Sequence, residues 1–199
     1  MTAPTLTLGP FDMDKVARTV DRINERLRRG AAALDAAGVP YAVIGGNAVI
    51  NWVSRVDESM IRFTKDVDFL LRRSDLEAAT AALTPVGFVF RKSGAMTMFL
   101  DGPDAKARDA IHVLFAAERV RETDLVPAPD VDECEATGEY RVLSLEALVR
   151  MKLNANRDHD RTHVRDLIKV GLVDAAWVGR FAGELAVRLQ HCLDTVEDD

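Results

Sequence analysis

The stretch Thr64-Lys65-Asp66-Val67-Asp68-Phe69-Leu70-Leu71 decides the fold. It ends in a short apolar run typical of a buried strand, and side chains along a strand alternate between its two faces. Asp66 and Asp68 therefore share one face, while Val67, Phe69 and Leu71 share the other. Two neighbouring carboxylates repel each other unless water or a cation separates them, and paired oxygen donors suit Mg²⁺ or Mn²⁺. The stretch predicts a strand that carries a divalent metal site.

A glycine pair follows an earlier strand-like run. Tyr41-Ala42-Val43-Ile44 leads into Gly45-Gly46-Asn47-Ala48, and a helix is expected from about 47 to 55. Such a turn presents backbone N–H groups at a helix N-terminus, where phosphate binds readily. A plainer explanation exists for each motif alone, namely a solvated acidic pair and a tight turn. Together, a phosphate site and a metal site in one small domain indicate phosphoryl or nucleotidyl transfer.

Length and composition are those of an ordinary globular protein. The 199 residues suit one domain with a helical extension, and we divide the chain into a core over 1–125 and a connecting and helical region over 126–199. Cys134 and Cys192 form neither a disulfide framework nor a zinc motif, which favours a reducing cytoplasm. The N-terminus has no signal-peptide pattern, and no apolar run is long enough to cross a bilayer.

The net charge of −6 argues against tight, non-specific binding to nucleic acid, but it allows a local basic face. Basic residues flank the acidic strand. They are either solvated strand and loop ends or a rim that attracts a triphosphate or a polynucleotide acceptor. The residues are Arg55, Arg62, Lys65, Arg72, Arg73, Arg91 and Lys92.

The remaining pattern predicts an α/β (α+β) fold, in which helices pack on a mixed sheet. A helical pattern over 11–37 is expected to break near Gly30, and Ser74 has the position of a capping-box residue before a helix over 75–84. Ser144 is the expected N-cap of a helical region that continues to the C-terminus. Strands are expected over 41–44, 86–91, 95–100 and 109–115, with a connecting loop over 120–138, and the helical pattern follows residues 140–143.

Lys152 lies on the apolar side of the predicted helix that starts at Leu145. A lysine is uncommon there unless it is paired or functional, although its stem can pack while its amine reaches water. Its functional role would be to contact a triphosphate. His159 and His163 lie one helical turn apart, as in a zinc-protease motif, but Asp160 replaces the glutamate base and no third ligand is evident. We therefore expect Asp160 to pair with Arg157 or to orient Lys152.

In this order, and with Arg62 and Thr64 leading into the acidic strand, these motifs resemble the nucleotidyltransferases of the DNA polymerase β superfamily. The resemblance covers about residues 41 to 172 and is closest to the bacterial branch of AbiEii-like toxins and uncharacterised nucleotidyltransferase-like proteins. A second match runs from Arg150 through Leu167 and includes Lys152. The resemblance implies a polymerase-β-type mixed sheet and metal ligands Asp66 and Asp68 for Mg²⁺ or Mn²⁺. The nucleotide-binding residues it implies are Gly45, Gly46, Asn47, Lys65 and Lys152.

One position departs from the family pattern. An active site of this type has a third carboxylate on a neighbouring strand, which here is Ala110-Ile111-His112-Val113-Leu114-Phe115. Alternation places His112 on the face where the family has its acid, and Asp109 has the wrong parity unless a bulge turns it. His112 is the third catalytic candidate, either as a general base or as a manganese ligand. It also fits a site that binds nucleotide without transferring it.

Two functions follow from the sequence. The first is a metal-dependent nucleotidyltransferase that moves a nucleoside monophosphate from an NTP to an acceptor hydroxyl. The acceptor is a tRNA end, a protein side chain or a small molecule. The second is a catalytically impaired nucleotide-binding protein or toxin–antitoxin component with the same fold. The helical C-terminus would support a homodimer, the family branch raises an antitoxin partner, and no membrane is involved.

Overall fold

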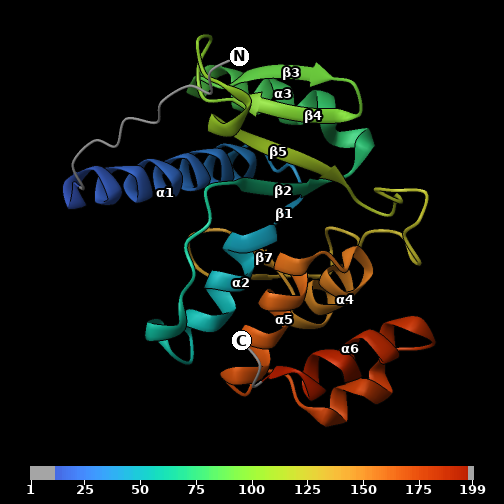
Figure 1. Cartoon of the computed structure of the whole chain (residues 1–199). Coiled ribbons are helices and arrows are strands. Elements are labelled where there is room, and N and C mark those ends of the chain that lie inside the picture. Colours follow the sequence, from blue (N-terminus) through green and yellow to red (C-terminus); the bar gives the residue numbers. More distant parts are fainter. Residues whose placement is uncertain (1–11, 197–199) are drawn as a thin grey trace, which may run out of the picture.

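The computed structural model describes residues 12–196 and has a mixed α/β fold (Figure 1). Its α-helices are α1 (Met13–Ala36), α2 (Gly45–Ser54), α3 (Leu76–Leu83), α4 (Leu145–Ala155), α5 (Asp158–Lys169) and α6 (Glu184–Asp194). Its strands are β1 (Tyr41–Ile44), β2 (Val67–Leu71), β3 (Val89–Ser93), β4 (Met96–Leu100), β5 (Ala110–Phe115), β6 (Cys134–Ala136) and β7 (Arg141–Leu143). Short 3₁₀ turns η1 (Glu58–Met60), η2 (Arg73–Asp75), η3 (Thr84–Val86), η4 (Ala107–Asp109) and η5 (Ala175–Arg180) join them.

These strands form one sheet in the order β3-β4-β5-β2-β1-β7-β6. The pairs β2–β5 and β1–β7 are parallel, whereas β1–β2, β3–β4, β4–β5 and β6–β7 are antiparallel. β2 and β5 therefore lie side by side at the centre of the sheet and run in the same direction. This arrangement confirms the mixed sheet with flanking helices that the sequence predicts.

Two hydrophobic layers cover opposite faces of the sheet. One layer joins α1 and α3 to a face that carries Val67, Phe69 and Leu71 from β2. The other joins α2 and the C-terminal helices to the opposite face, which carries Ile44 and Leu70. In Figure 1 the C-terminal helices, orange to red, form one group at the far end of the sheet from β3. The second layer leaves the face around the start of β2 open.

Several local expectations are wrong. α1 is continuous through Gly30, because this glycine provides a close approach to the sheet: a Cβ there would lie 2.5 Å from Ile111 Cδ1. Ser74 lies inside the 3₁₀ turn η2 and gives no capping hydrogen bond to α3. The strand expected over 86–91 begins three residues later, after a turn in which Gly87 has a φ of 94°.

The region after β5 also differs from the expectation. The predicted loop over 120–138 contains β6, which pairs with β7 at the edge of the sheet. Ser144 is the N-cap of α4, as predicted, and its hydroxyl accepts a hydrogen bond from Ala147 N. The helical C-terminal pattern resolves into α4, α5 and α6. No helix among residues 12–196 combines the length and apolar character needed to cross a membrane.

Candidate active site

Alternation along β2 presents Asp68 to the open face of the sheet. Val67, Phe69 and Leu71 have no exposed surface and pack beneath α1 and α3, whereas the Asp68 side chain keeps 21% of its surface exposed. Asp66 directly precedes the strand and is exposed. Both acids line the same cavity, of about 330 Å³. The predicted face of Asp68 is confirmed, whereas Asp66 reaches the same cavity from the residue before the strand.

The glycine pair begins α2 beside these acids. Gly45 has a φ of 69°, and a Cβ at this position would overlap Asp68 Oδ2. A Cβ on Gly46 would lie 2.7 Å from Thr64 Cβ. No side chain caps the start of α2, so its first N–H groups remain available to a ligand. Glycine is required at this turn because the acidic strand passes directly against it.

Asn47 and Lys65 take different places from the other predicted nucleotide-binding residues. The Asn47 side chain is buried, and its Nδ2 donates a 2.7 Å hydrogen bond to Asp66 O. It thus holds the backbone of the acidic residue and does not line the cavity. Lys65 is exposed and also lies outside the cavity lining. The cavity does bring together Gly45, Gly46, Asp66, Asp68, His112 and Lys152.

His112 lies directly beside Asp68 on the adjacent parallel strand. His112 Nε2 is 2.9 Å from Ala107 O, which only accepts hydrogen bonds, so the Nε2 atom carries the proton. In the neutral ring, Nδ1 then has a free lone pair, and this atom is 3.8 Å from Asp68 Oδ1. A ring nitrogen held in this way by a backbone carbonyl has the orientation and tautomer of a metal ligand or a base.

The surroundings of Asp68 disfavour its ionised form. Burial raises the pKa of Asp68 to about 6, His112 opposes this rise, and the neighbouring charge of Asp66 adds to it. A carboxylate that is costly to ionise alone is stabilised by a bound cation. Two carboxylates and an imidazole nitrogen are donor types that a divalent ion accepts, manganese in particular. Among residues 12–196, no three such side chains are already gathered closely enough to form a complete metal site.

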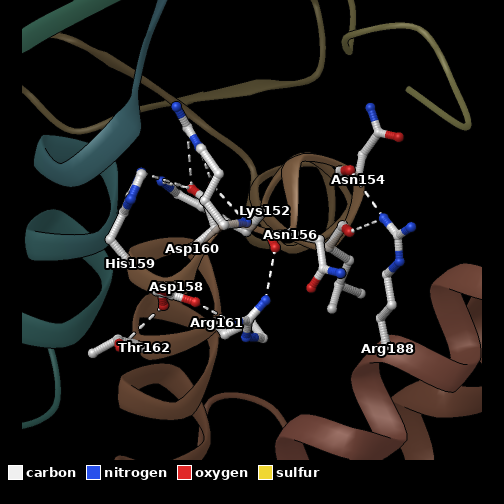
Figure 2. A network of polar contacts seen from close by, with 11 residues as sticks. Lys152, Asn154, Asn156, Asp158, His159, Asp160, Arg161, Thr162 and Arg188 are labelled. Carbon is white, nitrogen blue, oxygen red and sulfur yellow. Dashed lines mark hydrogen bonds and ion pairs between the residues drawn. The ribbon is translucent and has the colours of Figure 1, made fainter. Parts of the chain in front are cut away.

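The opposite wall of the cavity comes from α4 and α5 (Figure 2). Lys152 is 6% exposed, and its Nζ lies 3.0 Å from Oδ1 of the fully buried Asp160. Arg157 Nε donates a 2.6 Å hydrogen bond to Asp160 Oδ2, and His159 Nε2 lies 3.5 Å from Oδ1. Burial alone would raise the pKa of Asp160, but Arg157 and Lys152 hold it below its ordinary value. The predicted pairing of Asp160 with Arg157, and its contact with Lys152, are confirmed.

A long-range contact anchors this wall from the C-terminal side. Arg188 of α6 donates hydrogen bonds of 3.0 Å to Leu153 O and Asn154 O, the carbonyls at the end of α4 (Figure 2). These last-turn carbonyls have no partner within the helix. The helix that carries Lys152 is thereby held against α6 by hydrogen bonds that have no local signal in the sequence.

Sequence reasoning also missed two parts of the cavity. His163 lines it, and burial lowers the pKa of His163 to about 4, so the ring is neutral at physiological pH. The loop after β5 contributes Val120, Arg121 and Asp124. Asp124 Oδ2 accepts hydrogen bonds from the backbone N–H groups of Val120 and Arg121, which shapes this loop. An aspartate a few residues along a loop often binds preceding backbone groups in this way, and that was the available signal.

The predicted basic rim divides into two groups. Four of its members form ion pairs with acids elsewhere in the fold: Arg55 with Glu135, Arg62 with Asp166, Arg72 with Asp130 and Asp132, and Arg73 with Glu118. Lys65, Arg91 and Lys92 have no carboxylate within 4.0 Å among residues 12–196. The ion-paired arginines support the interpretation of the basic residues as solvated strand and loop ends. The three residues without an acidic partner remain available to a ligand.

Several solved structures resemble this chain. The antibiotic-resistance factor ANT(2'')-Ia in solution is 14% identical, with a TM-score of 0.49 over 92% of this chain and 95% of that one. The same protein in complex with adenylyl-2''-tobramycin is 15% identical, with a TM-score of 0.47 over 91% and 98%. An antigenic nucleotidyltransferase-like protein from Paracoccidioides brasiliensis is 16% identical, with a TM-score of 0.48 over 89% and 88%.

No family model matches the chain, and no curated protein sequence matches it. These structural neighbours are nucleotidyltransferases or are described as similar to them. Identities and TM-scores of this size do not decide the chemistry of this chain. That chemistry depends on the two walls of its own cavity.

Proposed function

We propose that this protein is a divalent-metal-dependent nucleotidyltransferase of the polymerase β type, which transfers a nucleoside monophosphate from an NTP to an acceptor hydroxyl. The observation that carries the proposal is the cavity with two unlike walls. Asp66, Asp68 and His112 line one side of it, and Lys152 and Arg157 line the other, next to the N-terminus of α2. A metal-bound triphosphate needs this combination of carboxylates, backbone N–H groups and cations.

The cation would be held by Asp66 and Asp68, with His112 Nδ1 as a third donor. When bound, Mg²⁺ or Mn²⁺ neutralises phosphate charge and lowers the pKa of a coordinated hydroxyl. The carboxylates and the imidazole nitrogen are the donors present on the open face of β2 and β5. Because one ligand is neutral and nitrogen-based, manganese suits the site better than magnesium.

Each remaining residue has a task set by its position. The N–H groups of Gly45 and Gly46 bind phosphate, and the missing Cβ of Gly45 keeps Asp68 within reach. The acceptor oxygen attacks the α-phosphorus, and its proton passes to solvent water, because the single free lone pair of His112, on Nδ1, is assigned to the cation. Lys152 and Arg157 stabilise the charge on the departing pyrophosphate. Asp160 is a positioning residue, because its one carboxylate forms ion pairs with both Lys152 and Arg157. The single negative charge of Asp160 leaves a net positive charge on this group.

The test combines nucleotide binding with turnover. Mn²⁺ and an NTP together should raise the melting temperature, and pyrophosphate should be released when an acceptor is present. We expect slow transfer with Mg²⁺ and faster transfer with Mn²⁺. His112→Asp should increase the Mg²⁺-supported activity or the Mg²⁺ affinity, because it restores an anionic ligand. The matched control is His191→Asp, at an exposed histidine on α6.

Melting temperatures separate this role of His112 from a structural one. If His112 is only a core residue bonded to Ala107, the aspartate is buried without a cation and destabilises the protein. An aspartate variant that is destabilised, and that Mg²⁺ fails to rescue, would remove His112 from the metal site.

His112 also favours a second function, a nucleotide-binding protein that does not transfer. An acid is replaced by a neutral ring at the position beside Asp68. Triphosphate binding without pyrophosphate release, across a broad panel of acceptors and with both metals, would establish this alternative. Under either function, we propose membership of the AbiEii-like branch, a cytoplasmic location, and a homodimer or an antitoxin as partner. The division at residue 125 remains a prediction.

A further inference from the structure

The cations of this protein are distributed unevenly between structural pairs and free positions. All 26 lysines and arginines lie within residues 12–196, and most are ion-paired. Eight of them have no carboxylate within 4.0 Å in that part of the chain: Lys15, Arg22, Lys65, Arg91, Lys92, Lys106, Arg119 and Arg121. Lys15 and Arg22 lie on α1, and most of the others surround the open face of the sheet that carries Asp68.

The free cations flank the acidic wall on several sides. Lys65 directly precedes Asp66 at the start of β2, and Arg119 and Arg121 follow the end of β5. Because β2 and β5 are parallel neighbours, these cations lie at opposite ends of the site. Arg91 belongs to a cross-strand row, since it pairs with Met98, Met98 with His112, and His112 with Asp68. Side chains in such a row share one face.

Exposed apolar side chains alternate with these cations. Phe63 is 73% exposed and lies two residues before Lys65. Val120 is 55% exposed between Arg119 and Arg121, and Met96 at the start of β4 is 59% exposed. A large aromatic side chain this exposed has no packing role in the fold. Next to a free lysine, it offers a flat surface for a base.

A second cavity adjoins the first on this side. It has a volume of about 430 Å³ and shares Asp68, His112, Leu114 and Val120 with the nucleotide cavity. Its other lining residues include Met96, Phe115 and Arg119. A group bound there has its reactive end beside Asp68 and His112, on the far side from the helical wall of α4 and α5. This is the position required of an acceptor.

We propose that the acceptor is the end of a single-stranded nucleic acid. Its phosphates contact Lys65, Arg91, Arg119 and Arg121, and its bases lie against Phe63 and Met96. Exposed apolar surfaces alternating with free cations match unstacked bases on a charged backbone, whereas a duplex conceals its base faces. Because the whole chain has a net charge of −6, we expect the nucleic acid to bind only at these two adjoining cavities, which together form the cleft.

The chemical step rests on the proposed nucleotidyltransferase function. The terminal hydroxyl oxygen of the strand forms a bond to the α-phosphorus of the NTP. The bond between the α-phosphorus and the bridging oxygen breaks, and pyrophosphate leaves with the electron pair. The hydroxyl proton passes to solvent water. The products are a strand extended by one nucleotide and pyrophosphate, so no further reactant is needed.

The test is binding of fluorescently labelled oligonucleotides to the full chain in Mn²⁺ buffer, measured by anisotropy over a range of salt concentrations. The probes are one sequence as single-stranded RNA, as single-stranded DNA and as a duplex. We expect the single strands to bind more tightly than the duplex, and the RNA and DNA arms identify the preferred sugar. Arg119→Ser/Arg121→Ser should weaken binding and reduce the salt slope by about 0.7 for each phosphate that is no longer neutralised.

Matched variants distinguish the cleft from general charge effects. Arg91→Ser should weaken binding, whereas Lys92→Ser, on the next residue but the opposite face of β3, should not. Lys15→Ser/Arg22→Ser removes two free cations from α1 and should have no effect. Phe63→Ser leaves the charge unchanged and should weaken binding about tenfold, because a base can no longer stack there. Circular dichroism checks that each variant is folded.

Three results would overturn the inference: equal affinity for duplex and single strand, equal loss of affinity in the α1 and cleft variants, or no oligonucleotide binding. Triphosphate binding measured on the same protein separates this failure from that of the proposed function. A protein that binds Mn²⁺-NTP but no oligonucleotide refutes only the nucleic-acid acceptor. A protein that binds oligonucleotide but no NTP refutes the transferase function, and the acceptor role with it.

Discussion

The two walls of the cavity between β2 and the helices α4 and α5 differ in how their buried charges are compensated. On the helical wall of α4 and α5, Asp160 has no exposed surface, yet Lys152 and Arg157 both contact it. On the acidic wall of β2, Asp68 is mostly buried, and its Oδ1 atom lies 3.8 Å from Nδ1 of His112. The pKa of Asp160 is therefore below its ordinary value, whereas that of Asp68 is raised to about 6.

This difference separates a completed ion-pair network from an incomplete one. Breaking a completed buried network leaves an uncompensated charge and costs stability. Removing a charge from an incomplete site relieves repulsion and should stabilise the protein without ligand. The helical wall thus stabilises the fold, whereas the acidic wall lowers its stability, as expected if the acidic wall binds a cation under the proposed function. Substitutions on the two walls should therefore change stability in opposite directions, and the largest change is expected on the helical wall.

Asp160→Asn should lower the free energy of unfolding by about 3–5 kcal/mol, because it leaves the buried Lys152 ammonium without its anion. Chemical denaturation measures this change. The control is Asp158→Asn, two residues earlier on the same helix, whose side chain is 97% exposed and pairs with Arg161. The control should change stability little. An Asp160→Asn variant as stable as the control would show that the helical wall is not held by this network.

Gly45→Ala should lower the free energy of unfolding by about 2–3 kcal/mol. The substitution combines the strain of a positive φ with an overlap between the new Cβ and Asp68 Oδ2. Gly138→Ala is the matched control, because Gly138 has a φ of 94° but no atom within 4 Å of the added Cβ. It should be destabilised by only about 1 kcal/mol. Equal destabilisation of both variants would mean that Asp68 moves freely away from the turn.

Strand parity was predictable from the sequence for a physical reason. The buried faces of β2 and β5 carry Phe69 and Val113, so a register shift would expose them, and alternation then places Asp68 and His112 on the open face. The continuity of α1 was not predictable, because the helical cost of Gly30 is offset by its packing against Ile111, far along the chain. The ion pair of Arg62 with Asp166 spans 104 residues and has no local signal either.

Lys152→Met should weaken binding of a triphosphate by about 1.5–3 kcal/mol, and that of a monophosphate less, because it removes a charged hydrogen bond to the outer phosphates. The single variant also leaves Asp160 with fewer partners, which lowers stability. Lys152→Met/Asp160→Asn removes both charges and should recover much of that stability while triphosphate binding stays weak. Calorimetry of both ligands decides the matter. An equal reduction for monophosphate and triphosphate would indicate that Lys152 only packs.

Asp68→Asn should raise the free energy of unfolding at pH 7 by about 1–2 kcal/mol in the absence of metal, with Mg²⁺-NTP binding abolished. The sign follows from the raised pKa. An unfolded aspartate titrates near 3.8, but folded Asp68 keeps its proton up to about pH 6. Between these values the folded state binds more protons, so wild-type stability from this group falls as the pH rises through 4 to 6. The free energy of unfolding of Asp68→Asn should therefore rise above that of the wild type between about pH 4 and 6, and the two should be equal near pH 4.

Denaturation of wild type and Asp68→Asn at a series of pH values, with and without Mn²⁺, measures this difference. Asp66→Asn is the control, since Asp66 is exposed and its removal should change stability less. Mn²⁺ should stabilise the wild type above pH 6 and lose its effect below, because a protonated carboxyl does not bind the cation. A stability difference between wild type and Asp68→Asn that does not vary with pH would mean that the acidic wall is already satisfied without a cation. The contrast between the two walls would then be wrong.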